Sequence, residues 1–505
     1  MKKILSMFSI MACLSMTAQE LSYQDALRYY FDNIQGTARF RAMGGAFGAL
    51  GGDMSAVSIN PAGSVIFNTS HASLSLDVNS INNDVDFFGR VNSNNDTDIN
   101  LNQAGAAFVF VNSNPNSKWN KFSLSLAYDI ANNYEDNWVA QGTNTNNSIA
   151  DYFLGYANGL RLDEISALPG ETLTDAYADI GSVFGFGHQQ AFLGYESFVI
   201  DPVQNTDDNT AYTSTIQGNN FDQRFVYATN GYNGKLAFNF ATQYDNKLSL
   251  GVNLNAHFID YTRSTLFTES NSDATSTTDF VDFRNDLYTT GAGFSLQLGA
   301  IYNLTDELRA GVSYNTPTWY RITEETSQYL ASREAGTNNF DIVNPNVINL
   351  YPDYRLQTPG KITGSLAYVF GKRGILSFDY SVKDYSNITF RPTSDAFFAQ
   401  ENQNIDNLLG QAATMRIGGE FKIKQLSLRA GYVTEESPFQ NNQLFGDLER
   451  YSAGLGYNFG DLKLDVSFVQ TQRDTNFQLF QVGLTDSAAL DTSRTDVTLT
   501  LSYSL

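Results

Sequence analysis

The sequence is poor in cysteine, histidine and charge, and these shortages exclude several classes of site. Its 505 residues contain one cysteine, Cys13, so neither an internal disulfide nor a cysteine metal site can form. The three histidines, His71, His188 and His257, stand far apart, and none has a second ligand at metal-binding spacing. Lys, Arg, Asp and Glu make up only 17% of the chain, less than in most soluble enzymes. A metal centre or a thiol catalyst is therefore not expected.

Long apolar runs are also missing. Beyond residue 18 no run of about 18 apolar residues occurs, so the sequence offers no membrane-spanning helix. Before that point Lys2 and Lys3 precede an apolar stretch that leads to Ala18, which predicts a signal peptide over residues 1–18. A lipoprotein signal ending at Cys13 is the alternative, although its apolar stretch would be short. The net charge of −22 at pH 7 argues against nucleic acid as a partner.

What the chain has instead is a repeated alternation of apolar and polar side chains. In Lys247–Phe258 every second residue is apolar: Leu248, Leu250, Val252, Leu254 and Ala256. The residues between them are small or polar. The side chains of a strand point to opposite faces in turn, so this segment needs an apolar environment on one face and a polar one on the other. Aromatic residues, at 13% of the chain, suit the girdles of a membrane barrel.

About fourteen such segments can be counted, an even number of the kind found in single-chain bacterial barrels. We therefore predict an all-β fold, a transmembrane antiparallel β-barrel; a soluble sandwich does not explain so many strands with connections of such unequal length. The predicted strands are His71–Asn79, Gln103–Asn112, Asn120–Asn132, Gly234–Gln243, Lys247–Phe258, Thr290–Tyr302, Glu307–Arg321, Lys361–Phe370, Gly374–Asp384, Thr414–Ile423, Gln425–Val433, Tyr451–Phe459, Asp461–Gln472 and Thr495–Leu505.

The connections between these strands alternate between short turns, expected at the periplasm, and long loops, expected outside the cell. The predicted long loops are Ser80–Asn102, Asn133–Asn233, Tyr261–Thr289, Ile322–Gly360, Tyr385–Ala413, Thr434–Arg450 and Arg473–Arg494. In the longest, apolar residues recur at helical spacing over Ile149–Leu160 and Leu173–Phe184, which predicts two short helices. Their apolar faces either form a landing surface above the barrel mouth or pack on each other and cap the lumen.

The segment before the first strand, residues 35–67, follows neither the strand period nor the helix period. It is dense in glycine, which permits positive φ and close backbone approach, so we expect a compact, tightly turned element. Asn60-Pro61-Ala62-Gly63 predicts a turn just before the first strand. The glycines fit neither G-x-G-x-x-G nor the lysine-containing phosphate loop, so a nucleotide site is not expected.

This segment resembles the FadL/TodX-type outer-membrane transporters of hydrophobic compounds. The resemblance rests on Gly45–Ala62 with its Asn60-Pro61-Ala62 turn, and the strand count and the long helical third loop support it. It implies a plug, or hatch, over residues 19–68, a barrel over residues 69–505, and a place in the outer membrane of a Gram-negative bacterium. It also implies an inward kink in the third strand that opens the wall, for which Gly105 in the second strand is the nearest candidate. The plug motif would comprise Gly45, Gly48, Gly51, Gly52, Asn60, Pro61, Ala62 and Gly63.

The function implied by the resemblance is passive uptake of small hydrophobic molecules, such as long-chain fatty acids, gated by the plug. No enzyme activity is expected, because the sequence has no G-x-S-x-G elbow, and no cofactor or metal is needed. The expected partners are the hydrophobic substrate and outer-membrane lipid or lipopolysaccharide. Arg39 and Arg41 either hold a substrate carboxylate or form ion pairs with the inner wall of the barrel.

Two other functions are open at this stage. Type IX secretion systems include a barrel component of this same family, which would bind secreted proteins rather than lipids. A purely structural porin or adhesin would instead show open conductance and no plug.

Overall fold

The computed structural model describes residues 27–29, 35–114, 116–441 and 444–505 of the chain. The predicted signal peptide, residues 1–18, lies outside the described residues, as do residues 19–26 and 30–34 of the predicted plug. None of the helices within the described ranges is long and apolar enough to cross a bilayer.

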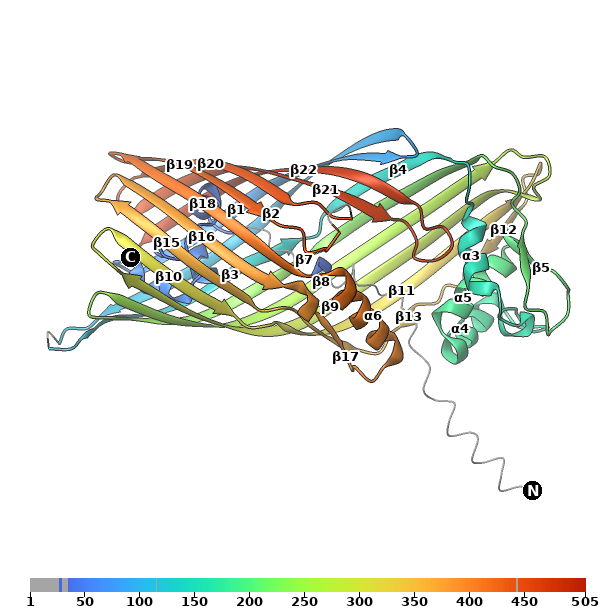
Figure 1. Ribbon diagram of the computed structural model, residues 1–505, viewed down its shortest axis with the longest axis horizontal. Helices are drawn as coiled ribbons and strands as arrows, with labels where there is room; N and C mark the ends of the chain where they lie inside the picture. The colour runs from blue at the N-terminus through green and yellow to red at the C-terminus, as the bar shows by residue number, and fades with distance from the viewer. Residues whose placement is uncertain (1–26, 30–34, 115, 442–443) are drawn as a thin grey trace, which may run out of the picture.

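Antiparallel strands close into a barrel (Figure 1), because β1 (His71–Phe87) pairs with β2 (Arg90–Val111) on one side and with β22 (Ser487–Ser504) on the other. Within the described residues the barrel has fourteen strand positions, which confirms the predicted fold. The remaining wall strands are β3 (Trp119–Asn133), β4 (Asp136–Asn144), β7 (Phe221–Tyr244), β8 (Leu248–Asn271), β9 (Thr278–Asn303), β10 (Leu308–Asn315), β11 (Trp319–Glu334), β15 (Lys361–Phe370), β16 (Gly374–Asp384), β18 (Gln411–Ile423), β19 (Leu426–Glu435), β20 (Leu448–Asn458) and β21 (Leu462–Gln478).

Two wall positions are each shared by two strands. β3 and β4 both pair with β7, so together they form one interrupted strand of the wall. In the same way β10 and β11 both pair with β9. Short strands lie at the long-loop end or beside the wall: β5 (Ile200–Pro202), β6 (Tyr212–Ser214), β12 (Phe340–Val343), β13 (Asn349–Leu350), β14 (Tyr354–Gln357) and β17 (Thr389–Arg391). The helices and 3-10 turns are α2 (Ala38–Ala42), η1 (Ser55–Ser58), η2 (Pro61–Ile66), α3 (Ile149–Ala157), η3 (Leu162–Glu164), α4 (Leu173–Phe184), α5 (Phe186–Glu196), η4 (Tyr385–Asn387) and α6 (Ala396–Leu408).

The two faces of the wall differ as the alternation predicts. On β8 the apolar residues Leu250 and Leu254 face outward and are exposed, whereas Asn253 and Asn255 face the lumen and are buried. Aromatic rings border the outward apolar rows at both levels: Trp119 lies 5.0 Å from Tyr244 near the short turns, and other rings gather at the opposite border. Those at the opposite border include Tyr128, Tyr232, Phe258, Tyr432 and Tyr451. Such paired girdles are typical of an outer-membrane barrel.

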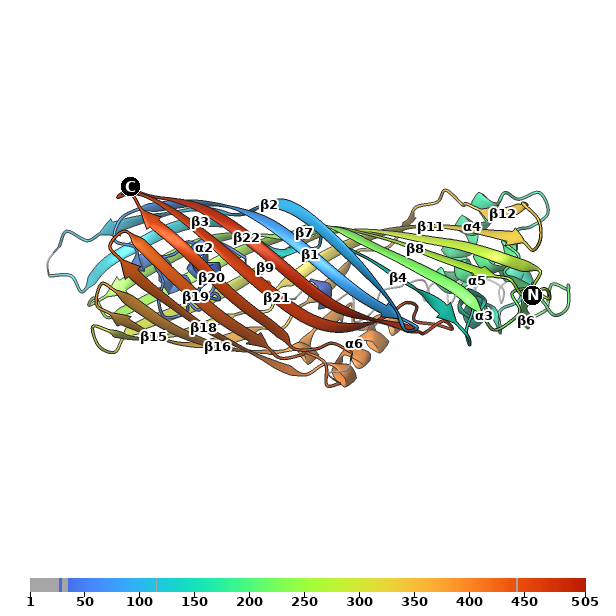
Figure 2. The same ribbon diagram turned by 90° about the horizontal axis from the view of Figure 1, so that it is seen from above.

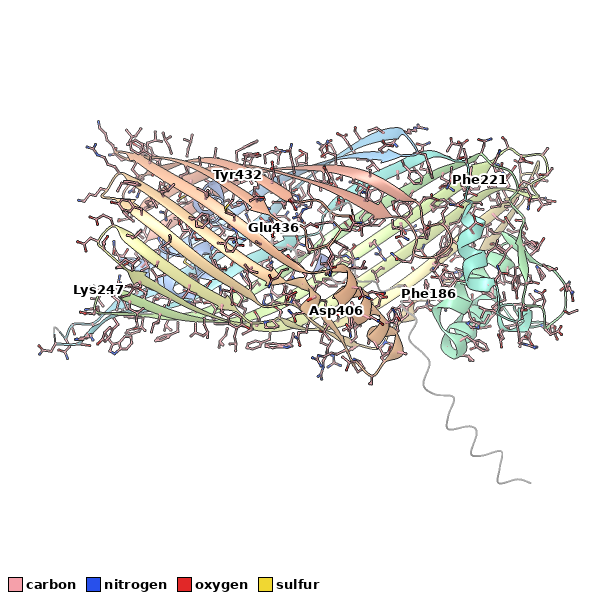
Figure 3. The ribbon with its side chains drawn as sticks, viewed as in Figure 1. Phe186, Phe221, Lys247, Asp406, Tyr432 and Glu436 are labelled. Carbon is pink, nitrogen blue, oxygen red and sulfur yellow. The ribbon has the colours of Figure 1, made fainter. Side chains whose placement is uncertain are left out.

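Several strands are longer than predicted, and the predicted loop Ser80–Asn102 is wrong. There β1 continues to Phe87 and β2 begins at Arg90, so the segment is a hairpin. β7, β8 and β9 extend in the same way beyond the outward apolar rows, as Figure 3 shows, where Lys247 lies at the short-turn end and Phe221 at the far end. The extensions have polar outward residues because lipid does not reach them, so they lack the alternation on which the prediction relied.

β2 and β3 separate from each other part-way along the wall, at a place that we call the parting of the wall. The β2–β3 ladder runs from Val111 opposite Lys121 to Gln103 opposite Asp129, and in the described residues the rest of β2 pairs with β1 alone. The β1–β2 ladder skips Asn102 and the β3–β7 ladder skips Ala131, whereas Gly105 pairs regularly with Ala127. Beside the parting of the wall, the irregular point of the third strand therefore lies at Ala131 and not near Gly105, and an inward kink there stays a prediction.

Candidate functional site

The Gly-rich residues 35–67, which we call the inner segment, lie inside the barrel near its short-turn end (Figure 2). α2 contacts β19 to β22, and η2 contacts β3 and β7 to β9, so the inner segment reaches across the lumen. α2 begins after Thr37, whose side chain accepts a hydrogen bond from Phe40 N at 3.2 Å, the usual way to satisfy a free N–H at a helix start. Phe40 packs on Phe47 with ring centroids 5.4 Å apart.

Lumen-facing amides hold the backbone of the inner segment. Asn239 on β7 donates to Pro61 O at 2.9 Å, Asn253 on β8 donates to Val57 O at 2.8 Å, and Gln297 on β9 donates to Ile59 O at 2.8 Å. Buried backbone carbonyls need a donor, and the polar inner face of the wall supplies it. The polar half of the alternation therefore serves contact with the chain's own N-terminal part.

The Asn60-Pro61 turn joins the inner segment both to itself and to the wall. Asn60 Oδ1 accepts a hydrogen bond from Ala62 N at 3.1 Å and thereby caps η2, with Pro61 in the first turn where no N–H is needed. Asn60 Nδ2 donates to Gly48 O at 2.7 Å and to Ala300 O of β9 at 3.0 Å. An aspartate at this position could not make the last two bonds.

Glycines in the wall make room for this turn. Gly251 of β8 and Gly299 of β9 face each other in the ladder. A Cβ added at Gly299 would lie 2.0 Å from Asn60 Oδ1, and one at Gly251 would lie 2.3 Å from the carbonyl carbon of Pro61. Our sequence reasoning missed these residues. Glycine at lumen-facing positions, where Asn and Ser otherwise occur, was the signal that could have revealed them.

The glycines of the predicted plug motif shape the inner segment itself. Gly48 N donates to both carboxylate oxygens of Asp379 on β16, at 3.0 and 3.2 Å. Gly51 lies close to Gly63: a Cβ added to Gly51 would lie 2.7 Å from the Cα of Gly63. Positive φ angles occur at Gly45, Gly51 and Gly52, where other L-residues are strained. The structure therefore places Gly45, Gly48, Gly51, Gly52, Asn60, Pro61, Ala62 and Gly63 in one element.

Arg39 and Arg41 both lie against carboxylates of the barrel wall. Arg41 is 2% exposed; its Nη1 lies 2.7 Å from Asp77 Oδ1, and its Nη2 lies 2.8 Å from Asp496 Oδ2. Arg39 Nε lies 3.0 Å from Glu420 Oε2. This geometry suits ion pairs that hold the inner segment in place; contact of either residue with a substrate carboxylate stays a prediction.

A cavity of 350 Å³, which we call the vestibule, lies in the lumen on the long-loop side of the inner segment. Aromatic and aliphatic side chains make up about half of its lining, which includes Phe225, Tyr227, Phe439, Phe445, Phe477, Leu479 and Phe480. Two cations, Arg28 and Arg263, and one acid, Asp136, also line it. The Arg28 guanidinium carbon lies 4.1 Å from the ring centroid of Tyr261, a cation–π contact. Such a chamber can hold an apolar molecule that carries one anionic or polar end.

The predicted helices pack over the far end of the lumen. The Tyr152 ring of α3 lies 5.6 Å from Phe283 of β9 and 4.8 Å from Phe480. Tyr177 of α4 donates to Gln328 of β11 at 2.8 Å, and burial raises its pKa. The capping arrangement therefore accounts for most of both apolar faces. Glu269 of β8 accepts bonds from Ile149 N and Gln223 at this cap, and burial raises its pKa to about 7.

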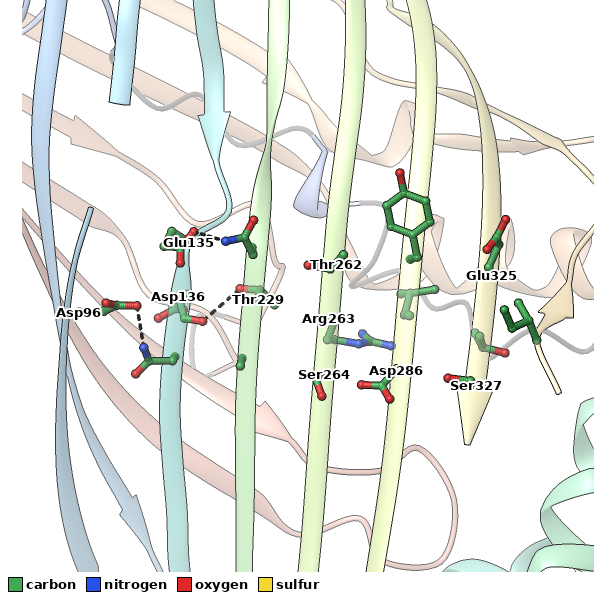
Figure 4. A pocket seen from close by; sticks show the side chains of 17 residues that line it. Asp96, Glu135, Asp136, Thr229, Thr262, Arg263, Ser264, Asp286, Glu325 and Ser327 are labelled. Carbon is green, nitrogen blue, oxygen red and sulfur yellow. Dashed lines mark hydrogen bonds between the residues drawn. The ribbon is translucent and has the colours of Figure 1, made fainter. Parts of the chain in front are cut away.

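A further cavity, of 460 Å³, lies at the parting of the wall (Figure 4). Side chains bridge the strands there: Asn137 donates to Asp96 at 2.6 Å, and Asn230 donates to Glu135 at 2.7 Å. Its acids outnumber its single cation, Arg263: they are Asp96, Glu135, Asp136, Asp286 and Glu325. Burial, with the charges of Asp98 and Asp96, raises the pKa of Glu135. In the described residues no three His, Cys, Asp or Glu side chains are placed to hold a metal ion.

The family described as outer membrane protein transport protein (OMPP1/FadL/TodX) matches residues 201–502 of the chain. The chain belongs to this family. Members of the FadL/TodX family are transport channels, so the protein is an outer-membrane channel for hydrophobic compounds and not an enzyme. The predicted family, the non-enzymatic role and the place in the outer membrane of a Gram-negative bacterium are thereby confirmed.

Solved structures with the same fold support the FadL/TodX architecture. The CymD monoaromatic hydrocarbon channel is 13% identical with a TM-score of 0.51, and the match covers 94% of this chain and 99% of that one. A Pseudomonas aeruginosa FadL homologue is 12% identical with a TM-score of 0.53 over the same shares. The Pseudomonas putida toluene transporter TodX is 14% identical with a TM-score of 0.50, covering 94% and 98%. No curated protein matches this sequence.

Proposed function

We propose that this channel takes up long-chain fatty acids and that the inner segment is the plug that gates it. The observation that carries the proposal is the vestibule, which combines a cluster of aromatic side chains with two cations, Arg28 and Arg263, against one acid, Asp136. An acyl chain loses water in such a chamber, at about 0.8 kcal/mol for each buried CH₂, while a carboxylate finds a guanidinium. Toluene, which the toluene transporter TodX is named for, carries no charge with which the two cations could pair.

Gating by the plug is supported by how the inner segment is held. Its attachments include an apolar cluster with Ala367 and Val433 of the wall, and hydrogen bonds and ion pairs such as those of Asn60 and Arg41. The polar contacts can be exchanged for water one at a time. Around the barrel, outer-membrane lipid would cover the apolar rows on the outer face of the wall. The periplasmic end would then receive the substrate once the plug moves.

The vestibule is tested by uptake of labelled oleate into cells that carry the Phe477→Glu variant. A carboxylate in the apolar lining should lower uptake about tenfold or more, since each 1.4 kcal/mol lost in binding is a factor of ten. Phe184→Glu is the matched control, because Phe184 is exposed on α4 and does not line the vestibule. Equal uptake by wild type and Phe477→Glu at equal surface abundance would show that the substrate does not pass through the vestibule.

The gate is tested by deletion of residues 60–63. The deletion removes the cap of η2 and both wall bonds of Asn60, so oleate uptake should change while the barrel still shows heat-modifiable migration on gels. If oleate uptake is unchanged at equal surface abundance, the inner segment is not the gate. If toluene enters as readily as oleate per unit concentration, the substrate class is wrong although the channel stands.

A further inference from the structure

A cavity of 420 Å³ lies where the inner segment meets the short-turn end of the barrel. The inner segment forms one side of it, through residues that include Arg39 and Phe67. The wall forms the other side, through the β18–β19 turn with Lys424 and the beginning of β21 with Lys463. Short turns face the periplasm in outer-membrane barrels, so this cavity opens toward the periplasm.

The charge of this cavity is opposite to that of the protein. The chain carries a net charge of −22, yet five cations and only three acids line the cavity. The cations are Arg39, Lys422, Lys424, Arg429 and Lys463, and the acids are Asp53, Glu420 and Asp465. An excess of two positive charges in a partly enclosed site attracts anions more strongly than the same charges would in open water.

The three acids are already engaged by groups of the protein. Glu420 Oε2 lies 2.6 Å from Arg429 Nε and 3.0 Å from Arg39 Nε, and Asp465 Oδ1 lies 2.6 Å from Arg429 Nη1. Asp53 accepts bonds from Thr37 Oγ1 at 2.7 Å and from its neighbour Ser55 N at 3.0 Å.

Lys422 Nζ lies 3.4 Å from Glu420 Oε1, so two of the five cations, both lysines, remain once these pairs are made. Lys424 and Lys463 have no ion pair within the part of the chain that the structure describes. Lys424 is exposed at the rim of the cavity, and Lys463 is half-buried on its wall. Their two ammonium groups supply the excess positive charge.

The lining is not only charged. Ile66 and Phe67 of the inner segment also line the cavity. A free phosphate would use the cations and leave this apolar surface wet, whereas an amphiphilic anion would cover both. The volume also falls within the range of about 300–1,000 Å³ that small-molecule sites occupy.

We propose that this cavity is a binding site for an amphiphilic carboxylate, with Lys424 and Lys463 holding the carboxylate and Ile66 and Phe67 covering the start of the acyl chain. The carboxylate is the transported molecule only if the proposed function holds; binding itself does not depend on it. The acidic cavity at the parting of the wall and the basic cavity at the periplasmic end together favour movement of an anion toward the periplasm.

The test is a titration of the purified full-length barrel in a neutral detergent with carbonyl-labelled octanoate, followed by NMR. All proteins carry Phe477→Glu, which blocks the vestibule and leaves the periplasmic cavity as the site observed. Lys424→Gln with Lys463→Gln should weaken octanoate binding about tenfold or more for each lysine, since bonds to charged groups contribute about 1.5–3 kcal/mol. Lys372→Gln, in the β15–β16 turn outside the cavity, is the matched control and should leave the affinity unchanged.

Three results would overturn the proposal. The first is equal octanoate affinity in the double lysine variant and in its control, with heat-modifiable migration showing that both are folded. The second is equal affinity for octan-1-ol, which has the chain but no charge. The third is displacement of octanoate by an equal concentration of inorganic phosphate, which would make the site one for free anions. Oleate uptake is measured in cells with the otherwise wild-type channel. Uptake there, with no octanoate binding to the purified protein, would refute this site alone, and octanoate binding without uptake there would refute the proposed function alone.

Discussion

Replacing Arg41 with methionine is the sharpest test of how the inner segment is held. The guanidinium is buried between Asp77 of β1 and Asp496 of β22, and its Nη1 also donates to Thr498 at 2.9 Å. Methionine keeps much of the length but leaves two buried carboxylates without a countercharge, and removing one partner of a buried pair costs about 3–5 kcal/mol. Because the pair joins the inner segment to the wall, its loss destabilises the seated state, in which the inner segment is bound inside the lumen, and not the barrel itself.

A cost of about 3–5 kcal/mol shifts the balance between seated and displaced inner segment by about 150- to 5,000-fold. Single-channel recording in planar bilayers measures that balance as the fraction of time spent conducting. Adding Asp77→Asn and Asp496→Asn to Arg41→Met removes the stranded charges, so the triple variant should return to within about tenfold of wild type. Arg224→Met, at an exposed position of β7, is the control for losing a cation. Wild-type behaviour of Arg41→Met, or a triple variant as leaky as the single one, would refute the reasoning.

Three further predictions follow from the wall and the cap. Gly299→Ala should weaken binding of the inner segment to the wall by about 1–3 kcal/mol, which faster proteolysis of residues 35–67 would show. Gly364→Ala is the control and should leave the proteolysis rate unchanged, because no atom lies within 4 Å of the added Cβ. Leu254→Arg, on the outward apolar row, should destabilise the barrel in liposomes by about 2–4 kcal/mol in urea titrations, but Thr262→Arg, further along the outward row of β8, by about 0–1. Burial raises the pKa of Glu269 from 4.5 to about 7, so the folded cap keeps a proton that the unfolded chain loses, and cap stability should fall by about 3 kcal/mol as pH rises from about 4.5 to about 7. Hydrogen exchange of α3 amides should show this slope in wild type and a flat profile in Glu269→Gln; parallel profiles would contradict it.

The strands that cross lipid could be predicted because lipid imposes a simple rule on them. Each outward side chain there must be apolar and each short turn must be brief, and the predicted bounds Lys361–Phe370 and Gly374–Asp384 match β15 and β16 residue for residue. Beyond the outward apolar rows the rule ends but the backbone ladder does not. A search for apolar alternation therefore misses the extensions of β1 and β2, although the hydrogen-bond ladder between these strands continues through them.

The candidate site could be predicted only where its contacts are local. The Asn60-Pro61 turn was recognisable because proline and asparagine set the backbone on the spot. Its partner Ala300 lies 240 residues away, and Asp496, the partner of Arg41, lies still further along the chain. Nothing in the alternation says which lumen-facing polar residue meets the inner segment, since serine, asparagine and glycine satisfy the strand pattern equally well.

The glycines of the wall bear on how a seated plug could also move. Gly251 and Gly299 carry no side chain at the contact, so the Asn60-Pro61 turn lies directly against the backbone of these two strands. A plug seated by a hydrophobic core would release only at a cost proportional to that area, at about 25 cal/mol per Å². Here the contact is partly apolar, since Met43 and Phe47 pack in one buried cluster with Val433 of the wall. The rest is polar, as in the contacts of Asn60 and Arg41, which water or an anion can replace in turn. In the proposed gate, a carboxylate bound in the periplasmic cavity competes with Glu420 for the guanidinium of Arg39, so an anion on that side would loosen the plug.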